Sequence, residues 1–271
     1  MLLSRRNLQS YHPLLIIIVI FVLLFDYVIS DNNNVDDVKA CELVKYGTIY
    51  GGWKLPIDIN LTSSSVIYSA GVGEDISFDI MMSEKYQSNL VLIDPTERSY
   101  QHYIEILNYY NNNRTGIFSA IIQQDYNHIL QSSNPNLNVI KYIKKGLWYK
   151  KDRLKFYKPN NDNYVSHTLI ENMYSDKYYI VDVDSIKNIM TELNHYHIDL
   201  LKLDIEGSEV IVLEQMIHDN IFPKYLCIEF DLVKQQIDHN QITAKMIDKL
   251  DLYGYKMIDN DNNNCLFELR K

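Results

Sequence analysis

The chain of 271 residues has only three cysteines, Cys41, Cys227 and Cys265, and no CxxC motif. Structural zinc sites need several Cys or His ligands at short spacings, so this scarcity disfavours a zinc site. An odd count prevents all three from pairing within one chain. Cys227 lies in an apolar, strand-like run and is interpreted as a small buried hydrophobic residue. A disulfide between Cys41 and Cys265 is left open.

The sequence also has no dense basic stripe. Its 35 acidic residues outnumber the 26 basic ones, and the net charge is −9. The densest basic cluster, residues 144–158, is interleaved with aromatics such as Trp148 and Phe156. This pattern favours an aromatic-basic hairpin packed on the fold over a nucleic-acid surface. No nucleic-acid partner is therefore expected.

The sequence has no GxSxG motif, which disfavours acyl-transfer chemistry by a serine triad. Ser166 and His167 are adjacent, but neighbouring residues of a strand point to opposite faces. These two residues are therefore not interpreted as a catalytic pair.

The first 30 residues resemble a targeting segment. Arg5 and Arg6 precede an apolar run over 14–25, and the small residue Ser30 follows. This order matches a secretory signal peptide, with the signal-anchor of a type II membrane protein as the alternative. Both place the remainder in the secretory pathway, as a secreted or single-pass membrane protein, because the basic residues stay cytosolic. A membrane partner is expected only if the segment is uncleaved.

The remaining chain divides at residue 64. Residues 31–64 are predicted to form a polar, Asn-rich linker and an N-terminal appendage without an assigned role. Residues 65–271 form the predicted domain, long enough for one good core.

The first motif of this domain is VIYSAGVGEDISFD, residues 66–79. A short strand leads into a turn at Gly71 and Gly73, and a helix is predicted from Glu74. A glycine turn between strand and helix lets the backbone approach a ligand closely and leaves helix N–H groups free.

A second strand is predicted over 89–93 and ends at Asp94. Nucleotide-binding folds place an acid at this point to bind ribose hydroxyls. Asp94 could instead cap a helix that starts before Glu97. The succession of strand, glycine turn, helix, strand and acid favours the ribose role.

The stretch around which the chain is organised is LLKLDIEGSEVIVLEQM, residues 200–216. An apolar strand ends at Asp204 and Glu206, Gly207 breaks it, and a helix follows. Acids at the carboxyl end of a strand in an open α/β sheet face the ligand site. Alternatively, Glu206 and Glu209 only favour the helix N-terminus electrostatically.

The rest of the chain continues the alternation of strands and helices, which predicts a doubly wound α/β sheet. Further expected elements are a third strand over 139–143, a hairpin over 155–164 turning at 159–161, an apolar stretch over 178–183, a helix over 184–193, a strand over 225–230, a helix over 242–252 and a closing hairpin over 255–269.

These motifs resemble the FkbM family of S-adenosylmethionine-dependent methyltransferases, from residue 65 to the C-terminus. The resemblance rests on residues 68–79, 91–99, 146–168 and 200–216 with CIEF at 227–230. It is nearest to the luminal, N-terminally anchored methyltransferase-like proteins. The resemblance implies a class I, Rossmann-like methyltransferase fold with seven strands, the last antiparallel.

The resemblance also implies a cofactor, S-adenosyl-L-methionine, and residues that hold it. Gly71, Gly73 and Glu74 would surround its amino-acid end, and Asp94 would hold the ribose. Gly146 and Leu147 would border adenine. Ser69 stands where many methyltransferases carry an acid, which puts its contact to the cofactor's amino group in doubt, although Glu74 or Asp75 could substitute.

The catalytic candidates are Lys202, Asp204 and Glu206. Methyl transfer chiefly requires orientation of the acceptor, and a hydroxyl acceptor must lose its proton. Asp204 or Glu206 could act as general base, or both could bind a divalent cation. Lys202 shares a strand face with Asp204 and could equally be its structural charge partner.

The sequence thus predicts an O-methyltransferase of the secretory pathway with a sugar, glycan or small-molecule hydroxyl acceptor. One alternative is a catalytically degenerate fold kept as a binding or scaffold module. A nicotinamide-dependent oxidoreductase is disfavoured, because Ser77 or Phe78 stands where a third glycine is expected.

Overall fold

The computed structural model describes residues 42–120, 122–161, 164, 166–171, 175–231, 239–261 and 264–270. The predicted targeting segment and most of the predicted linker lie outside these residues, as does Cys41. Cys265 is a free, buried thiol, as is Cys227. Among the described helices, none combines the length and apolar character needed to cross a bilayer.

A seven-stranded sheet forms the centre, in the order β11-β12-β10-β9-β3-β4-β5. Five adjacent strands are parallel, whereas β12 is antiparallel to both of its neighbours. The predicted antiparallel last strand is therefore confirmed. The strands are β3 (Val66–Ala70), β4 (Asn89–Ile93), β5 (Ile140–Ile143), β9 (Leu200–Leu203), β10 (Tyr225–Glu229), β11 (Tyr255–Asp261) and β12 (Asn264–Leu269).

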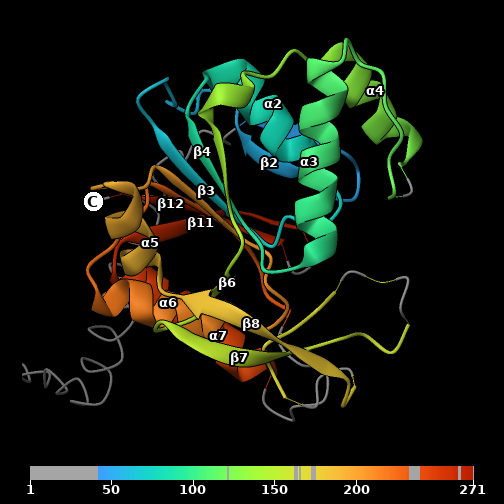
Figure 1. Ribbon diagram of the computed structural model, residues 1–271. Coiled ribbons are helices and arrows are strands. Elements are labelled where there is room, and N and C mark those ends of the chain that lie inside the picture. The colour runs from blue at the N-terminus through green and yellow to red at the C-terminus, as the bar shows by residue number, and fades with distance from the viewer. Residues whose placement is uncertain are drawn as a thin grey trace, which may run out of the picture. The chain divides into compact units, whose positions relative to one another are not determined.

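Helices cover both faces of this sheet (Figure 1). One layer contains α2 (Ser77–Tyr86), α3 (Glu97–Asn111) and α4 (Gln124–Ser132); the other contains α5 (Ile186–Leu193), α6 (Glu209–His218) and α7 (His239–Leu252). A short 3-10 helix, Leu137–Val139, precedes β5. Because both faces are covered, the parallel strands are largely apolar, and Val66–Ala70 is buried along its whole length.

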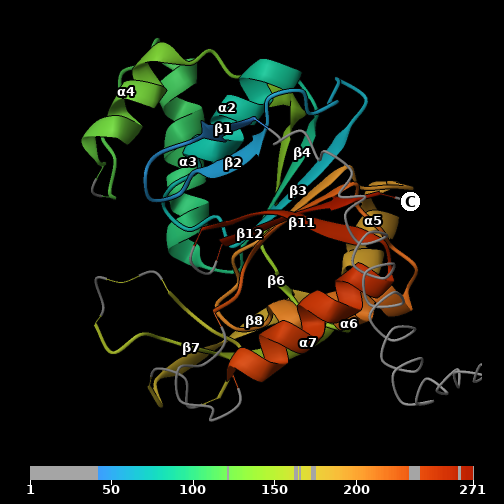
Figure 2. The same ribbon diagram turned by 180° about the vertical axis from the view of Figure 1, so that it is seen from behind.

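The N-terminal appendage contains an antiparallel hairpin of β1 (Leu43–Tyr46) and β2 (Trp53–Pro56). The hairpin lies beside α2 and α3 (Figure 2), and Tyr46, Trp53 and Leu55 are buried in the core on that face of the sheet. Residues 42–64 thus belong to the same compact unit as the domain that follows.

A second sheet of three strands has the order β6-β8-β7, with β6 (Gly146–Leu147), β7 (Asp152–Tyr157) and β8 (Tyr178–Asp184). The prediction of a hairpin over 155–164 is wrong. β7 does not pair with the residues directly after the predicted turn at 159–161 but, along its whole length, with β8. Among the residues described between 158 and 171, Thr168 forms an isolated antiparallel bridge to Tyr157.

Two helices also differ from expectation. α2 begins at Ser77 instead of Glu74, because Asp75 accepts a hydrogen bond from the Ser77 N–H (2.9 Å) and holds the preceding residues as a turn. α4 was not predicted at all. The helix over Ile186–Leu193 agrees with the prediction, and Ser185 caps it by accepting from the Asn188 N–H (3.2 Å).

Candidate active site

The glycine turn follows β3 at the carboxyl edge of the sheet. Gly71 and Gly73 have φ angles of +73° and +54°, which side chains disfavour. A Cβ atom on Gly71 would lie 1.6 Å from the carbonyl oxygen of Asp204. The glycine turn therefore lies directly against the backbone that follows β9, and only glycine permits this approach.

Asp94 joins the end of β4 to the glycine turn. Its Oδ2 accepts from the Gly73 N–H (3.1 Å), and its Oδ1 accepts from the N–H (2.8 Å) and hydroxyl (2.7 Å) of Thr96. Burial raises the Asp94 pKa, although these bonds and the charge of His167 oppose the rise. A carboxylate has roughly four acceptor positions, so Oδ2 can accept one more bond.

The alternative role of Asp94 as a helix cap is wrong. Thr96 is the N-cap of α3, and its side chain accepts from the Ser99 N–H (3.2 Å). Asp94 is therefore available to bind both the turn and a ligand.

Glu74 lies in the turn before α2 and makes a two-pronged ion pair with Arg98 of α3, with nitrogen–oxygen distances of 3.0 and 2.6 Å. The neighbouring Asp75 accepts from Ser77 and Thr48. The positions of both acids are thus fixed by protein partners.

Lys202 is almost fully buried in β9. Its ammonium donates to the Gly71 carbonyl oxygen (3.2 Å) and contacts Oδ2 of Asp204 (3.4 Å). Burial by itself would lower the Lys202 pKa, but the charges of Asp204 and Asp79 raise it above its ordinary value. Lys202 therefore stays charged and connects the glycine turn to Asp204 at the end of β9. This contact agrees with the prediction that Lys202 and Asp204 share one face of the strand.

The loop from Asp204 to Glu209 has an unusual backbone. Glu206 adopts a φ of +54°, a region that residues other than glycine rarely occupy. The fully buried Glu209 accepts from the N–H groups of Ile205 (3.0 Å) and Gly207 (3.2 Å). Thr168 donates to the Glu206 carbonyl oxygen (2.5 Å). Glu209 is therefore a loop support, whereas Glu206 faces a cavity.

Acids from two neighbouring strands meet at this edge. Carboxylate oxygens of Asp204, Glu206 and Asp231 all lie within 4.8 Å of one another. Glu229, at the end of β10, is adjacent; burial and the charges of Asp204 and Asp231 raise its pKa to about 8. We call these four residues the acid cluster. Its oxygen ligands suit a hard divalent cation such as Mg²⁺ or Ca²⁺.

Asp231 and Glu229 had not been assigned to the site from the sequence. The signal that could have identified Glu229 is its position next to last in the predicted strand over 225–230. β10 pairs in parallel with β9, so the carboxyl ends of both strands reach the same edge.

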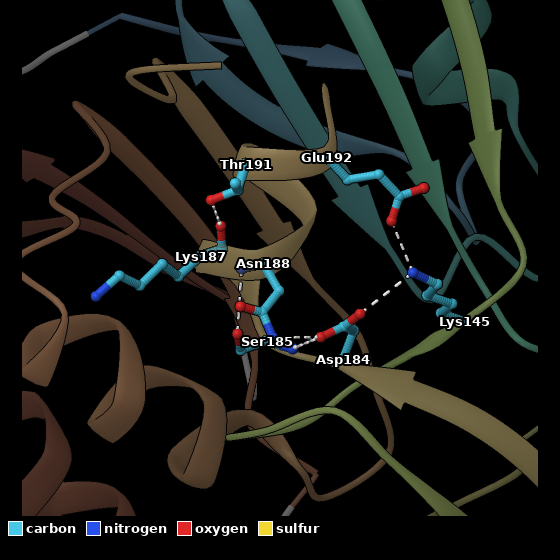
Figure 3. A network of polar contacts seen from close by, with 7 residues as sticks. All are labelled: Lys145, Asp184, Ser185, Lys187, Asn188, Thr191 and Glu192. Carbon is cyan, nitrogen blue, oxygen red and sulfur yellow. Dashed lines mark hydrogen bonds and ion pairs between the residues drawn. The ribbon is translucent and has the colours of Figure 1, made fainter. Parts of the chain in front are cut away.

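Lys145, which directly precedes Gly146 and Leu147 of β6, belongs to a polar network with residues of β8 and α5 (Figure 3). The Lys145 ammonium contacts Asp184 (3.2 Å) and Glu192 (2.8 Å), and the Trp148 N–H donates to the Asp184 carbonyl oxygen (2.9 Å). The end of β8 and the last turn of α5 therefore hold the segment that contains β6.

These elements enclose one cavity of about 610 Å³. Among the described residues, its lining includes every predicted site residue except Ser69: Gly71, Gly73, Glu74, Asp94, Gly146, Leu147, Lys202, Asp204 and Glu206. Ser69 is fully buried in β3 and does not line the cavity. The cavity is completed by residues not predicted from the sequence, among them Tyr50, Phe156, His167, Glu229 and Asp231.

Comparisons with known proteins identify the family of the chain. A search among curated proteins finds no match. One similar solved structure is an rRNA methylase from Streptococcus thermophilus, with 8% identity and a TM-score of 0.38 over 78% of this chain and 90% of that one. The family model for the methyltransferase FkbM domain matches residues 60–257. The chain therefore belongs to the FkbM methyltransferase family.

Proposed function

We propose that this protein is an S-adenosylmethionine-dependent O-methyltransferase that acts on a hydroxyl group of a sugar, glycan or small molecule. The observation that carries the proposal is that the glycine turn, Asp94 and the acid cluster line a single cavity. One side of the cavity suits a nucleoside and the other suits a proton-donating acceptor. The cavity also has the volume typical of a small-molecule site.

The residues at the nucleoside side fit the cofactor. Gly71 and Gly73 present backbone to the cavity without side chains, and Asp94 retains an acceptor position for a hydroxyl. Gly146 and Leu147 provide an apolar wall for a base. When bound, S-adenosylmethionine supplies a methyl group carried on a positively charged sulfur.

The residues at the acceptor side supply orientation and a proton acceptor. Asp204, held by Lys202, or Glu206 removes the proton from the acceptor hydroxyl. The buried Lys202 fixes the direction of the Asp204 carboxylate through this contact. In the metal-assisted alternative, Asp204, Glu206 and Asp231 hold a divalent cation that lowers the pKa of the hydroxyl.

The proposed location is the secretory pathway, with the protein secreted or anchored as a type II membrane protein. The support is the order of basic residues, apolar run and small residue within the first 30 residues. The acceptor would then be a molecule of the lumen or the cell surface.

Calorimetric titration of the full-length protein with S-adenosylhomocysteine, with NAD as control ligand, tests the cofactor assignment. We expect binding of S-adenosylhomocysteine alone, and loss of that binding in Asp94→Ala. A matched control is Glu97→Ala, which removes an acid whose side chain is 75% exposed at the start of α3.

The other outcomes separate the alternatives. Binding of NAD would support an oxidoreductase. Binding of neither ligand by a folded protein would support the scaffold module, and both results would contradict the proposal.

A further inference from the structure

The N-terminal appendage supplies part of the cavity wall. The turn 47–52 joins β1 to β2, and its residues Ile49, Tyr50 and Gly51 line the cavity. Ile49 is 85% exposed and Tyr50 is 70% exposed. Two adjacent large, exposed side chains at a cavity mouth indicate a contact surface for a ligand.

The turn is held firmly to the domain. The buried Thr48 donates its hydroxyl to Asp75 (2.6 Å) and its N–H to the Ser77 hydroxyl (2.9 Å). The Ile49 N–H donates to Asp125 (2.9 Å). A side chain presented from a fixed backbone costs less entropy to order when a ligand binds. The backbone that carries the exposed Tyr50 ring is therefore already fixed before a ligand binds.

The Tyr50 ring lies near the acid cluster. Partial burial raises the pKa of its phenol, and the negative charges of Asp204, Glu206 and Glu229 raise it further. The phenol thus keeps its proton and can donate a hydrogen bond. An aromatic side chain and several carboxylates thus line the same cavity.

The aromatic ring and the carboxylates together favour one chemical class of ligand. Carboxylates accept hydrogen bonds from hydroxyls but repel phosphates and carboxylates. An aromatic face carries negative charge density and attracts polarised C–H bonds. A neutral sugar ring offers C–H groups on one face and hydroxyls at its edge, so it satisfies both surfaces.

We propose that Tyr50, supported by Ile49, forms the acceptor subsite and selects a neutral sugar ring, an inference that rests on the proposed methyltransferase function. The appendage thereby becomes part of the active site. The acid cluster receives the ring hydroxyls, and Tyr50 covers the ring face.

The test is saturation-transfer NMR on full-length protein saturated with S-adenosylhomocysteine. The probes are methyl glycosides of glucose, galactose, mannose and fucose, with methyl glucuronide and the open-chain polyol mannitol for comparison. We expect transfer to ring C–H protons of at least one neutral glycoside, and little transfer to glucuronide or mannitol.

Three variants sharpen this test. Tyr50→Ala should weaken glycoside binding by about five- to tenfold, the size of an aromatic stacking contact. Tyr50→Phe should keep most of the affinity, because the ring remains. Tyr196→Ala is the matched control, since Tyr196 is 92% exposed and does not line the cavity.

Unchanged glycoside binding in Tyr50→Ala, or equal binding of mannitol or glucuronide, would overturn the inference. So would the absence of glycoside binding by protein that binds S-adenosylhomocysteine, and the methyltransferase proposal would then stand. Failure to bind S-adenosylhomocysteine would overturn both.

Discussion

Gly71 and Asp204 lie so close that a Cβ atom on Gly71 would be 1.6 Å from the Asp204 carbonyl oxygen. Gly71 belongs to the glycine turn on the proposed nucleoside side of the cavity, and Asp204 is the first residue of the acid cluster. Lys202 adds a second link, because its ammonium contacts both residues. The two halves of the cavity are therefore built on one shared backbone contact.

Gly71→Ala should disrupt both halves. The new methyl group would force the two loops apart and strain a positive φ, at a cost of about 3 kcal/mol in the free energy of unfolding. Thermal unfolding and S-adenosylhomocysteine titration would measure the effect. Gly116→Ala is the control, because a Cβ there meets nothing nearer than 3.8 Å. Wild-type affinity in Gly71→Ala would show that the contact is unimportant.

Asp204→Asn should reduce turnover and spare the cofactor. The amide keeps the shape of the side chain but cannot take a proton, so kcat should fall about 100-fold. The Kd for S-adenosylhomocysteine should stay within about twofold, a free-energy change below 1 kcal/mol. Kinetics with the best glycoside acceptor would show this, with the exposed Asp182→Asn as control. Undiminished kcat would remove Asp204 from the mechanism.

Asp184→Asn should weaken cofactor binding from a distance. The buried Asp184 side chain ties Lys145 to the start of α5 and so fixes the Gly146–Leu147 wall. Loss of the Asp184 charge should lower S-adenosylhomocysteine affinity by about tenfold, because Lys145 then keeps Glu192, the more exposed of its two carboxylate contacts, and its link to β8 weakens. The control Glu192→Gln removes the more exposed partner of Lys145 and should have little effect. Equal affinities in the two variants would exclude this positioning role.

Asp79 should make stability depend on pH. Burial raises its pKa from 3.8 to about 6, despite the opposing charge of Lys202. Between those values the folded chain holds a proton that the unfolded chain has lost, so the free energy of unfolding falls as pH rises.

Asp79→Asn should remove this dependence. Relative to wild type, the variant should gain on the order of 3 kcal/mol between pH 4 and pH 6, and nothing further above pH 6. Thermal melts of both proteins across this range would measure the difference. A difference in stability that does not vary with pH would mean that Asp79 titrates normally.

Local patterns were sufficient to predict the central sheet and most of the residues that line the cavity. β3, β4 and β9 are short, largely apolar runs followed by a polar or glycine residue, at Gly71, Asp94 and Asp204. Since the carboxyl ends of parallel strands share one edge, strand order alone brings these residues together. The predicted roles of Lys202 and Glu206 in catalysis stay predictions, although both line the cavity.

Other features depend on contacts between distant residues. β7 pairs with a strand about twenty residues further along the chain, and nothing in its own sequence specifies that partner. Tyr50 reaches the cavity because Thr48 binds Asp75 and Ser77, which no local motif encodes. α4 is short and mostly polar, and Tyr126 and Leu130 are its buried residues, so its sequence offers little apolar content to predict a packed helix.

A crystal structure of the full-length protein with S-adenosylhomocysteine would test the central claim most directly. We predict that the ligand occupies the cavity with its ribose hydroxyls on Asp94, its adenine beside Leu147 and its sulfur toward Asp204. A ligand bound elsewhere, or with its adenine against the acid cluster, would contradict the assignment of the two sides of the cavity.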